Sequence, residues 1–345
     1  MIEINKKLAF NHKKPPLIIA EISGNHAGSK KRFLSLIKSA CKSGADLIKI
    51  QTYEPEDITL SKRSRFFKIK KGIWKGKYLF DLYKKACTPY EWHNEAFKIA
   101  KKYKKIIFSS PFSIRAVDFL EKFNVPIYKI ASFEITDYKL IDYIASKKKP
   151  IIISTGMANL NEIQNAIKII EKYHKKIIIL HCVSNYPTKI EDANLDRINF
   201  LKKKFKSYKI GLSDHTNNIF TSIASVPLGV CVIEKHFNID NKKTLDSLFS
   251  INSKMLKDLK EISNKIFISL NKKHKIKNLK KNIKFRRSIF AKIDINKNEK
   301  ISLSNTVSLR PSIGLGSENI FKIIGKKVNR KVLKDSPIFL NDLKK

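Results

Sequence analysis

The chain has 345 residues, 42% of them hydrophobic and 29% charged, so we expect a folded protein with one large domain and room for a small second one. Its four cysteines include no C-x-x-C pair, which argues against a zinc cluster or a redox dithiol and favours a reduced, cytoplasmic setting. Residues 1–14 are polar, without the apolar segment of a secretory leader, and no apolar run approaches the ~20 residues of a membrane span.

The formal net charge of +41 raises the question of a nucleic-acid partner. Lysines are spread over the whole chain, and arginine, whose planar fork suits bases and phosphates better, is scarce. We therefore expect no nucleic-acid site and no membrane partner. A positive field of this size favours anionic substrates instead.

Short apolar segments alternate with longer amphipathic ones from the start of the chain to about residue 240. One amphipathic segment has Phe33, Leu36, Ile37, Ala40 and Cys41 at helical spacing. The expected strands are Leu17–Ile22, Leu47–Thr52, Ile106–Ser109, Ile127–Ala131, Ile151–Thr155, Ile177–Val183, Lys209–Leu212 and Val230–Phe237. Eight such units predict an α/β protein with a (β/α)8 TIM barrel. A doubly wound open sheet is the main rival, but no G-x-G-x-x-G follows the first strand.

The texture of the sequence changes after about residue 270. Residues 271–284 are rich in lysine and asparagine and have no strong period, which predicts a linker. Short β-like pieces separated by turn residues follow, and they predict a small, mostly β domain over residues 285–345. The barrel domain is then expected to span residues 1–270.

Polar residues recur where the expected strands end. In a barrel, the reacting residues come from the C-terminal ends of the strands and from the loops just beyond them. Lys49 and Lys129 lie inside otherwise apolar strands, where a lysine without an anionic partner is costly. Two lysines and several hydroxyls that converge on one barrel mouth would bind a small anion carrying phosphate and carboxylate groups.

Two histidines, His215 and His236, follow the neighbouring seventh and eighth strands. Two imidazoles on adjacent strand ends, with a carboxylate such as Glu21 nearby, can hold one divalent metal and leave positions open for substrate. Mn²⁺, Mg²⁺, Co²⁺ and Zn²⁺ all suit such a site, and the residues do not choose among them.

The segment 20–28, AEISGNHAG, resembles the opening motif A-E-[IML]-x-x-N-H-x-G of the sialic acid synthases. Further blocks similar to that family follow in order: GADLIKIQT at 44–52, YKIAS at 128–132, STGM at 154–157, GLSDHT at 211–216 and EKHF at 234–237. The resemblance covers nearly the whole chain. It implies a TIM barrel followed by a small antifreeze-like (SAF) β-clip domain, whose features include Arg310-Pro311 and Gly314-Leu315.

Within that family, segments 71–83, 88–93 and 108–112 are most similar to the pseudaminic acid branch. That branch condenses phosphoenolpyruvate with the open-chain aldehyde of 2,4-diacetamido-2,4,6-trideoxy-altrose. The alternative is the N-acetylneuraminate or legionaminate branch, which uses N-acetylmannosamine or a diacetamido analogue. The sequence departs from the family at Ala27, often Asn, at His181, often Lys, and at 244–247, where TLDS replaces a Gly-Pro-Asp-Ser-like run.

The resemblance also implies roles for individual residues. Glu21 would orient the aldehyde or a metal-bound water and could move a proton, and a metal on His215 and His236 would polarise the aldehyde oxygen. The residues expected to bind phosphoenolpyruvate are Lys49, Gln51, Ser110, Lys129, Ser132, Ser154, Ser184 and Ser213. Those expected to contact the sugar are Glu134, Tyr186, Asp246 and Arg310. Arg310 would reach the barrel mouth of the partner in a domain-swapped homodimer.

Overall fold

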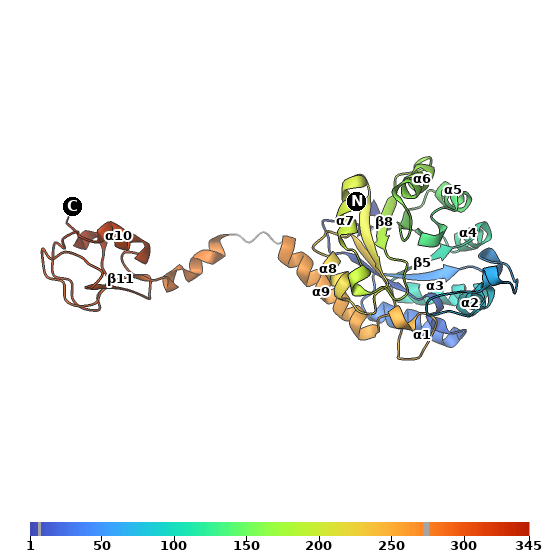
Figure 1. Cartoon of the computed structure of the whole chain (residues 1–345), viewed down its shortest axis with the longest axis horizontal. Helices are drawn as coiled ribbons and strands as arrows, with labels where there is room; N and C mark the ends of the chain where they lie inside the picture. The colour runs from blue at the N-terminus through green and yellow to red at the C-terminus, as the bar shows by residue number, and fades with distance from the viewer. Residues whose placement is uncertain (6–7, 272–275, 345) are drawn as a thin grey trace. The chain divides into compact units, whose positions relative to one another are not determined.

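The computed structural model describes residues 1–5, 8–271 and 276–344 (Figure 1). The chain divides into two compact units, Met1–Asn271 and Lys272–Lys345, which are described separately below. No helix among the described residues is both long enough and apolar enough to cross a bilayer.

The first unit is built around a closed barrel of parallel strands, in the order β10-β3-β4-β5-β6-β7-β8-β9. The strands are β3 (Leu17–Glu21), β4 (Leu47–Thr52), β5 (Ile106–Pro111), β6 (Tyr128–Ile130), β7 (Ile151–Ser154), β8 (Ile177–Cys182), β9 (Lys209–Asp214) and β10 (Val232–His236). Each lies within two residues of its expected bounds. The predicted TIM barrel is therefore confirmed. A short hairpin of β1 (Ile2–Glu3) and β2 (Ala9–Phe10) precedes it.

Helices follow the barrel strands along the chain. They are α1 (Lys30–Lys42), α2 (Leu79–Ala86), α3 (His93–Lys102), α4 (Ile114–Glu121), α5 (Tyr138–Ser146), α6 (Leu160–Glu171), α7 (Asp196–Lys204), α8 (Phe220–Ser225) and α9 (Ser253–Asn271). Helix α1 begins where the Ser29 hydroxyl accepts a hydrogen bond from the Arg32 N–H. It buries Phe33, Leu36, Ile37, Ala40 and Cys41, the stripe that its helical spacing predicts.

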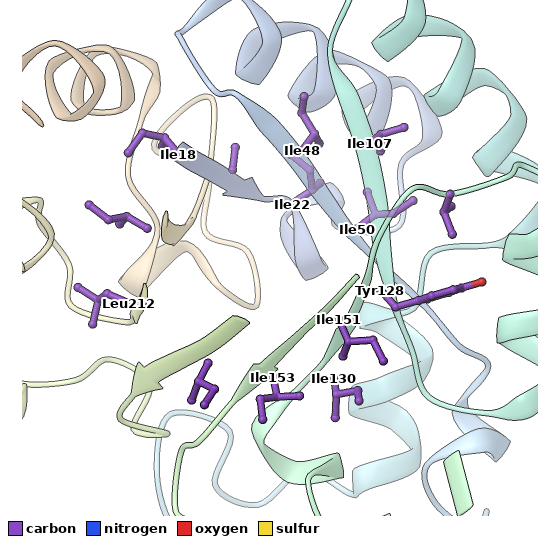
Figure 2. Close-up of a cluster of buried hydrophobic side chains, with 14 of the residues drawn as sticks. Ile18, Ile22, Ile48, Ile50, Ile107, Tyr128, Ile130, Ile151, Ile153 and Leu212 are labelled. Atoms are coloured by element: carbon purple, nitrogen blue, oxygen red, sulfur yellow. The ribbon is translucent and has the colours of Figure 1, made fainter. Parts of the chain in front are cut away.

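The strands bury one face against the helices and the other inside the barrel. Ile18, Ile48 and Ile153 belong to the outer cluster that packs against the helices, part of which Figure 2 shows. The residues next to them along the strands, such as Ile19 and Ile152, belong to a separate inner cluster. This alternation follows from the two-residue period of a strand, and it gives the barrel two distinct apolar layers.

The second unit has its own small core. It contains η8 (Ile276–Phe285), an antiparallel pair of β11 (Ser288–Ala291) with β12 (Thr306–Leu309), and the short helix α10 (Ile320–Ile323). Buried apolar side chains, among them Ile289, Ile301 and Ile338, fill its centre. The predicted linker covers residues 271–284. Asn271 is the last residue of α9, residues 276–284 belong to η8, and residues 272–275 lie outside the described part of the chain.

Candidate active site

The inward-facing positions change from apolar to polar along most of the barrel strands. On β3 they run Leu17, Ile19, Glu21, and on β4 they run Leu47, Lys49, Gln51. The same change occurs between Ile127 and Lys129, Ile152 and Ser154, and Val232 and Glu234. Because all eight strands are parallel, these polar ends meet at one mouth of the barrel.

Two lysines and two glutamates form an ion cluster in this mouth. Lys49 Nζ lies 2.6 Å from Glu21 Oε2 and 3.5 Å from Glu234 Oε1. Lys129 Nζ lies 3.7 Å from the same Glu234 oxygen. None of the four residues is more than 3% exposed. Buried charges this close together need one another, and an arriving anion would compete with the carboxylates for the two lysines.

Burial and charge shift the pKa values of this cluster in different directions. Burial raises the pKa of Glu21 to about 7, although the Lys49 cation opposes the shift. Burial also acts to raise the pKa of Glu234, but the cations Lys129 and Lys49 outweigh it and hold that pKa below its ordinary value. Burial lowers the pKa of Lys129, against the pull of Glu234. Of the two glutamates in this cluster, Glu21 is therefore the one better able to gain or lose a proton near neutral pH.

Hydroxyl groups surround the two lysines. Lys49 Nζ donates to Ser110 Oγ at 3.5 Å, and Ser213 Oγ donates to Glu234 Oε1 at 3.3 Å. Ser132 Oγ and Ser184 Oγ lie 2.9 Å apart. Ser154 Oγ is buried without a hydrogen-bond partner. These hydroxyls leave donors and acceptors free for a phosphate group.

Gly156 allows two loops of the mouth to meet. A Cβ atom at this position would lie 2.4 Å from Ser132 Cβ and 2.5 Å from Ser184 Oγ. Its φ angle of +42° is also one that residues with side chains rarely adopt. A cavity of about 410 Å³ lined by Gly156 and Ser184 extends from this point, with Arg197 on its wall.

The imidazoles of His215 and His236 lie side by side, with ring centres 5.5 Å apart. The backbone carbonyl of Val183 lies 2.7 Å from His215 Nδ1, a contact that orients the ring and leaves Nε2 facing the site. His236 Nδ1 is buried without a hydrogen-bond partner and lies 3.8 Å from Asp246 Oδ2. Burial lowers the pKa of His215 to about 4 and holds that of His236 well below its ordinary value, so both rings are neutral at pH 7.

This pair fits a divalent cation. Neutral imidazoles are the form that binds a metal, and an unpartnered buried ring nitrogen is the kind of atom that a metal would satisfy. No group of three or more His, Cys, Asp or Glu side chains arranged around a common point occurs in the described part of the chain.

Three of the four residues expected to contact the sugar, Glu134, Tyr186 and Asp246, belong to the barrel unit. The ring centres of Tyr186 and His215 are 4.4 Å apart, and Asp246 Oδ2 accepts from the Gly24 N–H at 2.9 Å. Burial raises the pKa of Glu134 to about 7, with Lys129 opposing the shift, and one of its carboxylate oxygens has no hydrogen-bond partner. Arg310 is exposed and follows β12 in the second unit, so its relation to the mouth stays a prediction.

Several residues of the mouth were not among the expected site residues. Glu234 joins both lysines, and its position two residues before His236 was the signal that it faces the same way. Ser23 is a second such residue: its Oγ accepts a hydrogen bond from Gln51 Nε2, which also donates to Glu21 Oε1, each at 3.1 Å. The ring of Phe249 lies 4.8 Å from that of His236, and no sequence pattern indicated it.

The first unit is a TIM barrel whose mouth combines buried lysines, hydroxyls and a neutral histidine pair, and the second unit is a small β domain. The NeuB family model matches residues 36–275, and the SAF domain model matches residues 286–344. The chain belongs to the NeuB family, and the expected resemblance and the SAF domain are thereby confirmed.

Curated relatives and a solved structure agree with this assignment. The chain is 42% identical to a pseudaminic acid synthase of Campylobacter jejuni, over 94% of this chain and 95% of the relative. It is 39% identical to a pseudaminic acid synthase of Helicobacter pylori, over 96% and 99%. The structure of an N-acetylneuraminic acid synthetase from Leptospira borgpetersenii, in complex with citrate, superposes with a TM-score of 0.73 at 28% identity, covering 81% of this chain and 95% of that one.

Proposed function

We propose that this protein is a pseudaminic acid synthase. It condenses phosphoenolpyruvate and water with the open-chain aldehyde of 2,4-diacetamido-2,4,6-trideoxy-altrose and releases phosphate. The observation that carries the proposal is the mouth itself, where the buried Lys49 and Lys129 lie with two glutamates. The similarity to two pseudaminic acid synthases over nearly the whole chain supports this branch of the family.

Phosphoenolpyruvate would bind where the two lysines converge. Its phosphate would accept hydrogen bonds from Lys129 and the hydroxyls of Ser132, Ser154, Ser184 and Ser213, and its carboxylate would lie near Lys49, Gln51 and Ser110. The free hydroxyl of Ser154 and the shared Lys49–Glu234–Lys129 contacts support this placement. Before phosphoenolpyruvate binds, the two lysines are paired with Glu21 and Glu234, and after it binds they would be paired with its phosphate and carboxylate. Neither buried cation is therefore left without an anionic partner.

The divalent metal, Mn²⁺, Mg²⁺ or Co²⁺, would be held by His215 and His236. When bound, such an ion polarises a carbonyl oxygen as a Lewis acid. The backbone carbonyl of Val183 would keep His215 in place.

The reaction forms a carbon–carbon bond and breaks a carbon–oxygen bond. C3 of phosphoenolpyruvate attacks the aldehyde carbon, and the developing positive charge at C2 is quenched by water. The tetrahedral intermediate then expels phosphate with the bridging oxygen. Glu21, whose pKa of about 7 lies near the working pH, would take a proton from the water and deliver one to the new hydroxyl.

The sugar would lie outside this centre, against Glu134, Tyr186 and Asp246. Arg310 from the partner subunit of a domain-swapped homodimer would complete the contacts. Its guanidinium fork suits a sugar carbonyl or hydroxyl.

Phosphate release from phosphoenolpyruvate tests the proposal. We expect release with the trideoxy sugar, loss of that activity on treatment with a chelator, and its return when Mn²⁺ is added. Turnover with N-acetylmannosamine but not with the trideoxy sugar would instead assign the protein to the neuraminate or legionaminate branch.

A further inference from the structure

A tight loop between β4 and α2, residues 68–78, places one tryptophan at a defined position. Lys68 pairs with Tyr78 in an antiparallel bridge, and Ile69 exchanges backbone hydrogen bonds of 2.9 Å with Lys77 and Gly76. We call this segment the Trp74 loop. The φ angles of Gly72 and Gly76, +83° and +86°, allow the turns on either side of Trp74.

The indole of Trp74 is held against the barrel mouth. Its Nε1–H donates to the carbonyl of Leu245 at 3.3 Å, directly before Asp246 in the loop that follows β10. Its ring centre lies 6.0 Å from that of Tyr186, which follows β8. Trp74 is half-buried, whereas its neighbour Ile73 is 38% exposed. The indole therefore connects loops from three strands, although it takes no part in the ion cluster.

Trp74, Tyr186 and Phe249 together make an aromatic wall beside the two histidines. The ring centres of Tyr186 and Phe249 are 5.1 Å apart, and the nearest ring distances from the wall to His215 and His236 are 4.4 Å and 4.8 Å. A sugar whose aldehyde reaches the histidine pair can lay the rest of its carbon chain against this wall, because the rings of Tyr186 and Phe249 border both histidines.

The chemistry of the proposed substrate matches such a wall. The trideoxy sugar carries a methyl group at C6 and two acetamido methyl groups, where N-acetylmannosamine carries a hydroxymethyl group and one acetamido group. The face of an aromatic ring packs well against methyl groups, but it offers no hydrogen-bond partner to a hydroxyl that lies against it. Discrimination by an apolar surface of this kind is of the order of 10- to 200-fold.

We propose that Trp74 is a specificity-determining residue, and that its indole is the surface against which the deoxy carbon and acetamido methyls of the sugar pack. This inference rests on the proposed function. It assigns to the Trp74 loop the selection of 6-deoxy diacetamido sugars over 6-hydroxy sugars, while the two lysines of the ion cluster bind phosphoenolpyruvate.

Steady-state kinetics with two sugars test the inference. The protein, its Trp74→Ala and Trp74→Phe variants and the control Ile73→Ala are compared with the trideoxy sugar and with its 6-hydroxy counterpart. Trp74→Ala is expected to lower kcat/KM for the trideoxy sugar by about 10- to 100-fold, mainly through KM, and to bring the ratio of the two sugars close to one. Trp74→Phe retains most of the preference. The KM for phosphoenolpyruvate stays within about twofold in every variant, because Trp74 lies outside the ion cluster.

Intrinsic fluorescence gives a second readout that needs no turnover. The chain has two tryptophans, and Trp92 is buried against His26 and Phe33. Addition of the trideoxy sugar without phosphoenolpyruvate, in the presence of Mn²⁺, should shift the emission of the unmodified protein and of Ile73→Ala. The shift should vanish in Trp74→Phe, where Trp92 alone remains.

Each result decides the matter. An equal loss with both sugars, or a rise in the KM for phosphoenolpyruvate, would mean that Trp74 only supports the fold of the mouth and would overturn the inference. Unchanged kinetics in Trp74→Ala would overturn it too. Failure of the proposed function is seen separately, because the unmodified protein would then release no phosphate with the trideoxy sugar.

Discussion

The two halves of the barrel interior contrast in chemistry although the same strands build both. The lower half contains Ile19, Phe108, Ile152 and Leu180, all completely buried and apolar. The upper half contains Glu21, Lys49, Lys129 and Glu234, buried almost as fully yet charged. The lower half therefore stabilises the fold, and the upper half holds charges at a cost in stability, which the proposed reaction would explain. Substitutions in the two halves should separate stability from activity.

The largest effect is expected at the histidine pair. His215→Ala removes one of the two imidazoles that would hold the metal, and we expect kcat to fall by about 10³-fold or more, since Lewis-acid assistance contributes several kcal/mol. The melting temperature measured without metal should fall as well, because the truncation leaves a cavity and removes a partner of the Val183 carbonyl, so rates are compared at a temperature where the variant is folded. An unchanged rate of phosphate release would mean that the pair holds no catalytic metal.

A truncation in the lower half should do the reverse. Ile152→Ala leaves a cavity in the inner apolar layer, and we expect the free energy of unfolding to fall by about 2–5 kcal/mol. Urea denaturation measures this loss. The KM for phosphoenolpyruvate should stay within about twofold at a temperature where the variant is folded, and a large rise in KM would show that the two halves are not separable.

Removal of one charge from the upper half should lower activity without lowering stability. In Lys129→Met, Glu234 keeps Lys49 as a partner at 3.5 Å, so no carboxylate is left without a cation. We expect kcat/KM for phosphoenolpyruvate to fall by about 100-fold, the loss of a charge-assisted hydrogen bond to the anion. The free energy of unfolding should be unchanged or higher. Marked destabilisation in urea would contradict the division of the barrel interior into two roles.

The smallest effect is expected outside the barrel interior. Asn159 accepts a hydrogen bond from the Glu162 N–H at the start of α6, and the Glu162 side chain returns one to the Asn159 N–H. Asn159→Ala should cost about 1 kcal/mol of stability in urea denaturation. Kinetic constants should not change, so this variant measures how far a modest loss of stability alone affects the assay.

The sequence predicted the barrel well because its strands are short apolar runs of the kind a parallel sheet requires. The two-residue spacing of Ile152 and Ser154, and of Lys49 and Gln51, already placed the polar side chains on the inner face of their strands. What the sequence could not supply was the partner of each charge. Glu234 on β10 meets Lys49 on β4, two strands away in the closed barrel. Trp74 meets Tyr186 and Leu245, and all of these contacts join segments more than a hundred residues apart in the chain. Such contacts follow from the closure of the barrel, which no local pattern encodes.

Mass spectrometry of the product formed from phosphoenolpyruvate and the trideoxy sugar is the most direct test of the proposal that this mouth joins the two. With phosphoenolpyruvate labelled with ¹⁸O at the bridging oxygen, we expect a nine-carbon acid free of the label and phosphate that retains it. A product that carries the label, or a nine-carbon acid formed only from N-acetylmannosamine, would contradict the proposed chemistry or the proposed substrate, respectively.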